Sequence, residues 1–367
     1  VYRLGISQKN SISLETISDF LSLIQKKQSY HLFHMLYPLY AGYLGTFWSA
    51  RFGIPGLLSI KRSDVENILT DPQLFPLGHW TFERVQAISA SSQHLVHQAI
   101  ALRGKDSQVF YLPDSVNLDF YQRKKKIHLS LPEGIKIGVF GDLEIPYGFK
   151  VLLHAFQLIG KARPEIHLIL SGVMGEEEEK LYQQFLLTSG LQSQIHFLEN
   201  MDEKELPYYL SQMDVVVFPH LRGDIPLMAL KAMACEAKVV CSDIGGFSEI
   251  IEHGVNGLLA SPGNPRALAS RIIKAIDEEF PTMGKKAREK VISSYSPQIE
   301  EEYLSQIYQK LLLSSSSGAL TAEAEVSHKG FSNSKNHDSS SGSMEAKDAA
   351  KETDNPETSH TEIPKNQ

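Results

Sequence analysis

The sequence predicts an α/β protein built from two Rossmann-like domains, and three features support this fold class. Short apolar runs alternate with amphipathic helical patterns along the body of the chain, which is typical of parallel α/β folds. The apolar runs are continuous and rich in Val and Ile, as strands are when helices cover both faces of their sheet. The length of 367 residues is sufficient for two ordinary domains and a tail.

Three parts are expected along the chain: a first Rossmann-like domain at 1–126 that looks incomplete, a second at 127–313 with closing helices, and a tail at 314–367. The tail is rich in Ser, Glu, Lys and Thr and has few large apolar residues. It therefore cannot bury enough surface to offset the entropy of ordering, and its composition predicts disorder.

Within the first part, the apolar runs and helical patterns predict strands at 1–7, 30–35, 56–60, 87–91 and 107–113, and helices at 14–27 and 41–53. The uncharged segment 32–50 is nearly long enough to span a bilayer. It also contains His34, Pro38, three Tyr and two Gly, which favours a buried strand followed by a packed helix over a membrane-spanning helix.

The second part is more regular, and its elements alternate between strand and helix. Predicted strands lie at 134–141, 165–172, 194–199, 214–219, 238–243 and 256–260. Predicted helices lie at 149–160, 176–189, 202–213, 226–235, 247–253 and 265–279, with closing helices over 283–313.

The net charge of −7 and the pI of about 6.1 argue against a nucleic-acid surface. The one short basic run, 123–126, is interpreted as a solvated linker. The two cysteines, Cys235 and Cys241, do not make a disulfide framework, which favours buried free thiols and a reducing, cytosolic setting. The chain carries no recognisable signal peptide and starts at Val1, which favours a fragment.

Glycines at strand ends indicate where a ligand would bind, because ligands of doubly wound sheets sit at the carboxyl ends of the strands. Gly141 follows one predicted strand, and Gly245 and Gly246 follow another and open a helix whose first turn contains Glu249. Backbone N–H groups at such a helix start can hold a diphosphate. The alternative is that these glycines only close turns, as they do in any α/β protein.

The region from about 135 to 313 resembles the nucleotide-sugar-binding domain of family-4-type glycosyltransferases, also described as glycosyl transferases group 1. The matching stretches include "IGVFGDLEIPYGFKVLLHAFQLI", "HLILSGVMGEEEEKL" and "DVVVFPHLRGDIPLMALKAMACEAKVVCSDIGGFSEIIEHGVNGLLASPGNPRALASRI". The resemblance implies the GT-B fold of two facing Rossmann-like domains. It also implies sugar transfer from a nucleotide-sugar donor, with retention at the anomeric carbon and with neither a metal nor another cofactor. The first part of the chain fits more loosely, and the opening strand with its Gly-rich loop looks missing.

The charged positions of this family are changed in the present sequence. Asp142 stands at the position of an Arg, Tyr147 at that of a Lys, and Gly223 and Lys231 at those of two Glu. In the family, the cations stabilise the leaving diphosphate and the two carboxylates hold hydroxyls of the sugar and the ribose. A carboxylate about 4 Å from a diphosphate charge costs roughly 4 kcal/mol at an effective dielectric constant near 20.

Neighbouring residues are candidate replacements for the lost groups. Lys150 lies about one turn into the following helix, Arg222 precedes Gly223, and Asp224 follows it. Lys231 itself is a candidate to face a phosphate. For Lys150 and Arg222 the alternative is an ordinary solvated surface.

On the acceptor side, Arg62 stands where the family usually carries a Gly that lets a substrate approach the backbone. Asp64 is a candidate for binding acceptor hydroxyls, with a helix cap as the alternative. His34 ends a strand and is a candidate for acceptor contact, with a satisfied core histidine as the alternative. A metal pair of His31 and His34 is disfavoured, because side chains three apart on a strand face opposite ways.

The sequence therefore favours a glycosyltransferase with a divergent donor site that acts on a glycan or lipid acceptor. A non-catalytic binding protein or a partner subunit of an active transferase is the main alternative, and another enzyme class such as a sugar-nucleotide epimerase is the third. The expected location is cytoplasmic, with contact to the inner face of the membrane or to a partner transferase. The candidate site residues are His34 and Asp224 for catalysis, Asp64 for the acceptor, and Gly141, Lys150, Arg222, Lys231, Gly245, Gly246, Glu249 and Asn256 for the donor.

Overall fold

The structure, a computed structural model, describes residues 14–104, 108–125, 129–199, 201–223, 226–278 and 280–328, with side chains described from 16 to 314 within these ranges. Its strands form a four-stranded sheet in the order β1-β2-β3-β4 and a six-stranded sheet in the order β10-β9-β8-β5-β6-β7. Residues 1–319 form one compact unit, and 320–367 form a second, of which the structure describes only the end of helix α13. The expected domain boundaries at 126 and 313 stay a prediction.

The four-stranded sheet is parallel throughout and has hydrophobic packing on both faces. Along β2, Leu58 and Ile60 pack against helices α3 to α5, whereas Leu57, on the opposite face, packs against α13. This division follows from the alternation of side chains along a strand. The elements are α1 (Leu14–Lys27), β1 (Phe33–Met35), α2 (Tyr40–Phe52), β2 (Gly56–Ile60), α3 (Arg62–Thr70), α4 (Phe75–Arg84), β3 (Ala87–Ala90), α5 (Gln93–Arg103) and β4 (Val109–Tyr111).

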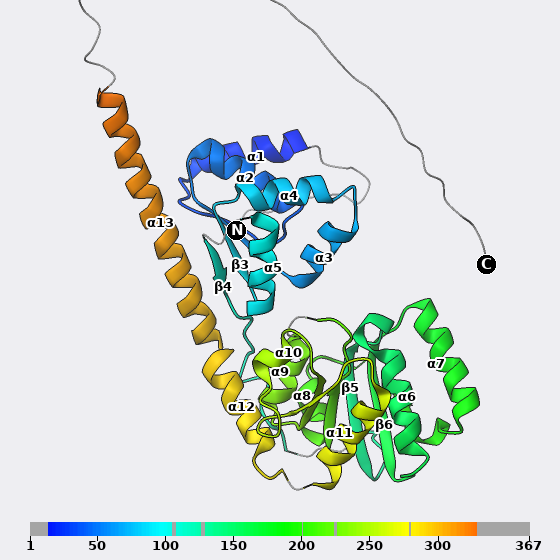
Figure 1. The fold of residues 1–367 in the computed structure, drawn as a ribbon. Coiled ribbons are helices and arrows are strands. Elements are labelled where there is room, and N and C mark those ends of the chain that lie inside the picture. The colour runs from blue at the N-terminus through cyan, green and yellow to red at the C-terminus, as the bar shows by residue number, and fades with distance from the viewer. Residues whose placement is uncertain are drawn as a thin grey trace, which may run out of the picture. The chain divides into compact units, whose positions relative to one another are not determined.

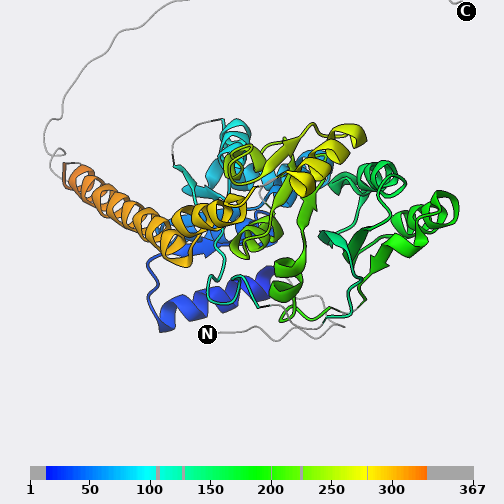
Figure 2. The same ribbon diagram turned by 90° about the horizontal axis from the view of Figure 1, so that it is seen from below.

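The six-stranded sheet is also parallel, and helices cover both of its faces (Figures 1 and 2). Helices α6, α7 and α11 contribute to one hydrophobic core, and α8, α9 and α12 contribute to the other. The elements are β5 (Ile135–Asp142), α6 (Phe149–Gly160), β6 (Ile166–Val173), α7 (Glu176–Ser189), β7 (Ile195–Phe197), α8 (Leu206–Gln212), β8 (Val215–Phe218), α9 (Leu227–Ala234), β9 (Val239–Ser242), α10 (Phe247–Ile250), β10 (Leu258–Ala260), α11 (Pro265–Asp277) and α12 (Met283–Ser294), with two short 3₁₀ helices at Ile145–Tyr147 and Gln192–Gln194.

The strand order places a topological switch point between β5 and β8. Strand β5 pairs with β6 on one side and with β8 on the other, so the connections leave in opposite directions from this point. Ligands of open α/β sheets bind outside the carboxyl ends of the strands at such a point. The fold therefore directs attention to the loops that follow β5 and β8.

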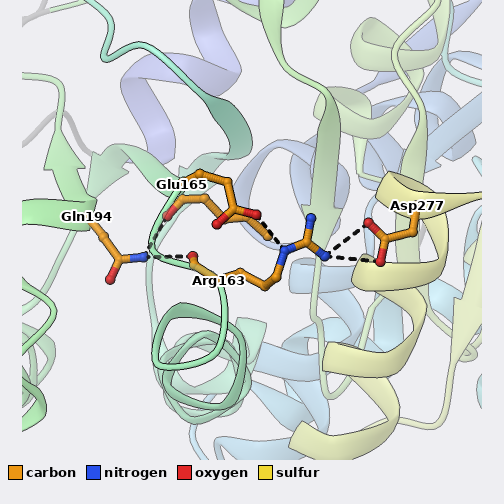
Figure 3. A network of polar contacts seen from close by, with 5 residues as sticks. Arg163, Glu165, Gln194 and Asp277 are labelled. Carbon is orange, nitrogen blue, oxygen red and sulfur yellow. Dashed lines mark hydrogen bonds and ion pairs between the residues drawn. The ribbon is translucent and has the colours of Figure 1, made fainter.

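At the other end of the six-stranded sheet, away from the switch point, a polar network surrounds Arg163 (Figure 3). The Arg163 guanidinium donates to Glu165 at 2.5 Å and to both carboxylate oxygens of Asp277, the last residue of α11, at 3.0 and 3.1 Å. The side-chain amide of Gln194 donates to the carbonyl oxygens of Arg163 and Ile166 at 3.1 and 2.9 Å. Because β6 begins at Ile166, this network holds the amino end of the strands, away from the switch point.

Helix α13 (Pro297–His328) follows the six-stranded sheet in the chain but packs against the four-stranded one (Figure 1). Its buried residues Ile307 and Leu311 lie in one hydrophobic cluster with Leu57 and Ala87. The prediction of disorder from residue 314 onward is wrong for 314–328, because the helix continues to His328. The segment 318–328 is rich in the helix formers Ala, Leu and Glu. Residues 329–367 lie outside the described part of the chain.

The segment 32–50 forms a strand and a helix, as predicted, and in the part of the chain that the structure describes no helix is long and apolar enough to cross a membrane. Helices α3, α4 and α5 are absent from the sequence-based prediction. The strand predicted at 1–7 lies outside the described residues. In the second part of the chain, the predicted helices at 149–160 and 176–189 match α6 and α7 at both ends.

Candidate functional site

A cavity of about 430 Å³ opens at the switch point. The carboxyl ends of β5 and β8 and the loops that follow them line it on one side, and the start of α3 lines it on the other. The residues that carry polar chemistry into it are Lys61, Arg62, Ser63, Glu66, Ser91, Asp114, Asp142, Tyr147, His220 and Lys231.

The two loops of the six-stranded sheet pack directly against each other beneath the cavity. Gly148 has a φ of +82°, and a Cβ on it would lie 1.8 Å from the carbonyl oxygen of Pro219. The backbone N–H of Leu221 donates to the carbonyl oxygen of Pro146 at 3.2 Å. Only glycine fits at position 148, because both the left-handed backbone and the close approach exclude a side chain.

The start of α3 holds two cations at the opposite wall. The Asp64 carboxylate accepts the backbone N–H of Lys61 at 2.8 Å, which caps the helix and fixes where it begins. The Lys61 ammonium pairs with Asp114, and the Arg62 guanidinium pairs through Nη2 with Glu66 one turn further along. The Arg62 side chain is only 14% exposed.

The second terminal nitrogen of Arg62, Nη1, points to the loop after β8. A Cβ built on Gly223 would lie 3.4 Å from Nη1, so the guanidinium occupies the space next to a position without a side chain. Among the described residues, Nη1 has no hydrogen-bond acceptor, whereas Nη2 bonds to Glu66. Arg62 therefore brings a positive charge from the four-stranded sheet to the end of β8.

His220 also lines the cavity, close to the positive charge of Arg62. Its ring packs against Tyr147, with centroids 5.2 Å apart, and against Phe247 at 5.3 Å. Burial, followed by the positive charge of Arg62, lowers the pKa of His220 from 6.5 to about 4, so the imidazole is neutral near pH 7. Its Nδ1 is inaccessible and has no hydrogen-bond partner among the described residues.

Tyr147 and Asp142 lie at the end of the cavity formed by the loop after β5. Burial and then the negative charges of Asp142 and Glu144 raise the pKa of Tyr147, while Arg62 opposes this shift. The phenol therefore stays protonated near neutral pH, as an uncharged hydroxyl donor. The carboxylates of Asp142 and Glu144 thus place negative charge beside Tyr147, against the positive charge of Arg62.

Lys231 extends from α9 at the cavity wall toward Glu203 and Tyr121. Its ammonium lies 3.0 Å from a carboxylate oxygen of Glu203 and 4.9 Å from the centroid of the Tyr121 ring, and the Tyr121 hydroxyl donates to the same Glu203 oxygen at 2.8 Å. Burial alone lowers the pKa of Lys231, but its interactions with Tyr121 and Glu203 outweigh burial, and the net shift is upward. Lys231 is therefore a stable cation at the cavity.

Of the residues predicted for the donor site, the cavity brings together Gly141 and Lys231. Lys150 and Arg222, predicted as replacement cations, are exposed and are not among the residues that line the cavity. Gly245 and Gly246 are also absent from its lining. Asp224 lies outside the described residues.

Three other predicted residues have structural partners instead. Glu249 accepts the backbone N–H groups of Gln93 and His94, at 2.9 and 3.0 Å, at the start of α5. Asn256 is buried, and it accepts from the backbone N–H of Glu252 and donates to the carbonyl oxygen of Ile250. For Asp64, the helix cap explains the contact that the structure shows.

His34 does not face the cavity that the sequence pattern suggested. Its Nδ1 lies 2.7 Å from the Tyr308 hydroxyl on α13, and its Nε2 lies 2.8 Å from the Ser59 hydroxyl, which in turn lies 2.6 Å from the Ser89 hydroxyl. Burial lowers the pKa of His34. His34 thus joins the sheet to α13 through both of its ring nitrogens.

Sequence reasoning missed the importance of Arg62 and His220. Arg62 departs from the family pattern, but nothing in the neighbouring sequence predicts that its side chain reaches a loop about 160 positions later. His220 follows an apolar strand and a proline, without a pattern of its own. Only the three-dimensional structure brings these two residues together.

Comparisons with known proteins identify a similarity to glycosyltransferases. A family model described as glycosyl transferases group 1 matches residues 120–294. The O-antigen chain mannosyltransferase B of Escherichia coli is 30% identical over 141 residues, covering 38% of this chain and 36% of that protein. The D-inositol 3-phosphate glycosyltransferase of Paenarthrobacter aurescens is 25% identical over 221 residues, covering 59% of this chain and 52% of that protein. The chain thus spans about a third to a half of the length of these two relatives.

A solved structure of HepE from Anabaena in complex with UDP superimposes with a TM-score of 0.69 at 20% identity, covering 79% of this chain and 82% of that one. At this identity the likeness concerns the fold. It confirms the arrangement of two Rossmann-like domains that the sequence resemblance implied.

Proposed function

We propose, from the match of residues 120–294 to the group 1 glycosyl transferases, that the chain transfers a sugar from a nucleotide-sugar donor to a glycan or lipid acceptor. The proposal rests on the cavity at the switch point between β5 and β8. Residues from the loops of both sheets line this cavity. The reaction proceeds with retention and without a metal, as the family resemblance implies.

The cavity offers suitable chemistry for a leaving nucleoside diphosphate, although its charges differ from the family pattern. The leaving group gains negative charge as the glycosidic bond breaks, and positioned donors and cations stabilise such charge. Arg62 and Lys231 supply positive charge. Asp142 opposes binding at its end of the cavity, so the diphosphate avoids that end.

We place the reaction in the cytoplasm, with a peripheral contact to the inner face of the membrane or to a partner transferase. The buried free thiols Cys235 and Cys241 support a reducing setting.

A non-catalytic role is the second candidate, and specific observations favour it. The four family positions for charged groups hold Asp142, Tyr147, Gly223 and Lys231. In addition, the carboxylate of Glu249, a predicted donor-site residue, accepts two backbone N–H groups at the start of α5. Such a protein would bind a sugar, a nucleotide or an active transferase without turnover.

Thermal unfolding of the full chain with nucleoside diphosphates and nucleotide sugars tests the donor site. A ligand at one hundred times its dissociation constant adds about 2.7 kcal/mol. The 319-residue unit has an unfolding entropy of about 0.7 kcal/mol/K, so the melting temperature should rise by about 4 °C. The matching nucleosides, which lack phosphate, are the control. No shift with UDP, GDP, ADP or their sugars would contradict the proposal.

Turnover then separates the two candidates. We expect release of the nucleoside diphosphate when acceptor glycans or lipids are added to the donor that binds. Because Lys150 and Arg222 do not line the cavity, Lys150→Ala and Arg222→Ala should leave turnover near the wild-type rate. Donor binding without turnover across the acceptor panel would favour the non-catalytic candidate.

A further inference from the structure

The three cationic side chains that line the cavity differ in how fully carboxylate partners engage their N–H groups. The Lys61 ammonium pairs with Asp114 and is half exposed. The Lys231 ammonium is held by Glu203 and lies over the Tyr121 ring. Arg62 pairs with Glu66 through one terminal nitrogen only, and its Nη1 lies beside Gly223, another residue that lines the cavity, without an acceptor among the described residues. Arg62 is therefore the cation best placed to receive an anion.

Positions 62 and 223 both depart from the family pattern, and they lie next to each other in the cavity. The resemblance leads one to expect a Gly at position 62 and a Glu at position 223, whereas this chain has Arg62 and Gly223. In the structure, the guanidinium lies 3.4 Å from where a Cβ of residue 223 would be, so a side chain there would compete with it for space. The resemblance implies a carboxylate on the loop after β8, whereas this chain has a cation that reaches the same place from the start of α3.

The surroundings keep this guanidinium in place and available. The Asp64 cap fixes the start of α3, from which Arg62 projects, and Glu66 restrains one edge of the guanidinium. The neighbouring His220 stays neutral beside it, so it adds no competing positive charge near pH 7. A planar guanidinium with a free edge matches two phosphate oxygens in a bidentate geometry.

We propose that Arg62 is the catalytic cation that holds the diphosphate of the nucleotide-sugar donor, in place of the Arg and Lys that the family carries at positions 142 and 147. This inference rests on the proposed function. In the transfer step, the bond from the anomeric carbon to the diphosphate oxygen breaks and its electron pair stays on that oxygen. The acceptor hydroxyl oxygen bonds to the anomeric carbon, and its proton passes to the departing diphosphate. Arg62 donates N–H bonds to the oxygens on which the negative charge develops.

The test measures dissociation constants of UDP, GDP and ADP by titration calorimetry on the full chain, each beside its nucleoside. For the nucleotide that binds the wild type, Arg62→Ala should weaken binding about ten- to one-hundred-fold, because a charge-assisted bond to phosphate is lost. Affinity for the nucleoside should change less than about twofold, since the nucleoside makes no bond to the guanidinium. The nucleotide affinity of Arg62→Lys should lie between those of the wild type and Arg62→Ala, because lysine keeps the charge but lacks the planar guanidinium.

Two further variants separate a specific contact from general charge or structure. Lys61→Ala removes an equal charge from the same cavity, and we expect an effect below about threefold because that ammonium is paired and exposed. Glu66→Gln frees the guanidinium and should tighten diphosphate binding, which a purely structural role for Arg62 would not produce.

The outcomes distinguish the failure of this inference from the failure of the proposed function. If the wild type binds none of the three nucleotides, the donor site itself is wrong and the inference falls with it. If the wild type binds one of them and Arg62→Ala binds it equally well, the assignment of Arg62 alone is overturned. An equal loss for nucleoside and nucleotide in a folded Arg62→Ala variant would also overturn it.

Discussion

Glu249→Ala should loosen the contact between the two sheets that enclose the cavity. The Glu249 carboxylate, from α10, accepts two backbone N–H groups at the start of α5, from Gln93 and His94. These N–H groups belong to the first turn of a helix and have no partner within it. The carboxylate thus caps a helix of the four-stranded sheet from the six-stranded one.

The magnitude follows from the two hydrogen bonds and the helix end. Each bond contributes about 0.5–1.5 kcal/mol net, and a negative charge at a helix start adds about 0.3–1 kcal/mol. Both bonds lie at exposed positions, so the lower part of the range applies, about 1–2 kcal/mol in total. With an unfolding entropy of about 0.7 kcal/mol/K for the 319-residue unit, the melting temperature should fall by about 1.5–3 °C.

Differential scanning calorimetry of the full chain measures this shift, and amide hydrogen exchange locates it. Exchange should accelerate at Gln93 and His94 in Glu249→Ala, and to a smaller degree in Glu249→Gln, which keeps one acceptor oxygen. Glu252→Ala is the matched control, because that side chain is exposed and lies in the same region. Equal melting temperatures for Glu249→Ala and Glu252→Ala, with unchanged exchange at 93 and 94, would refute the reasoning.

Three further predictions concern the cavity and the core. The pKa of His220 falls from 6.5 to about 4 on folding, so the stability that its neutral form contributes is complete above pH 6.5 and is lost as the pH falls. Urea unfolding should show a loss of about 3 kcal/mol from this group by pH 4. The His220→Asn variant should lack this pH-dependent loss. Gly148→Ala should destabilise by more than the roughly 1–2 kcal/mol of left-handed strain that we expect for Gly53→Ala, since a Cβ at 148 also meets a backbone oxygen and one at 53 meets nothing within 4 Å. Burial raises the pKa of Cys235 to about 12 and that of Cys241 well above its usual range, so both thiols should resist alkylation until denaturant is added; rapid native labelling would contradict this burial.

The sequence predicts the strands of both sheets but misses the helices α3, α4 and α5 of the first part, for a physical reason. Strands β5, β6, β8 and β9 are buried on both faces, so they appear as continuous apolar runs that only a covered parallel strand explains. Helices α3 and α4 bury only two or three residues each, and α4 contains both Pro76 and Gly78. Their helical pattern is too short and too interrupted to separate from a loop.

The candidate site was only partly predictable. The place of the cavity follows from the strand pattern, because the switch point depends on chain order and parallel pairing. The identity of its cations does not, since Arg62 reaches Gly223 across the two sheets. Glu249 shows the reverse case: its helix position was predicted correctly, but its partner at the start of α5 lies about 155 residues away in sequence.

Helix α13 has a consequence for the order in which the chain folds during synthesis. One face of the four-stranded sheet, at Leu57 and Ala87, is covered by Ile307 and Leu311, more than 200 residues later. At about 5–20 residues per second, that face waits on the order of ten to forty seconds for its cover. The four-stranded sheet therefore emerges from the ribosome before the six-stranded one, but it is completed only after the six-stranded sheet has been synthesised.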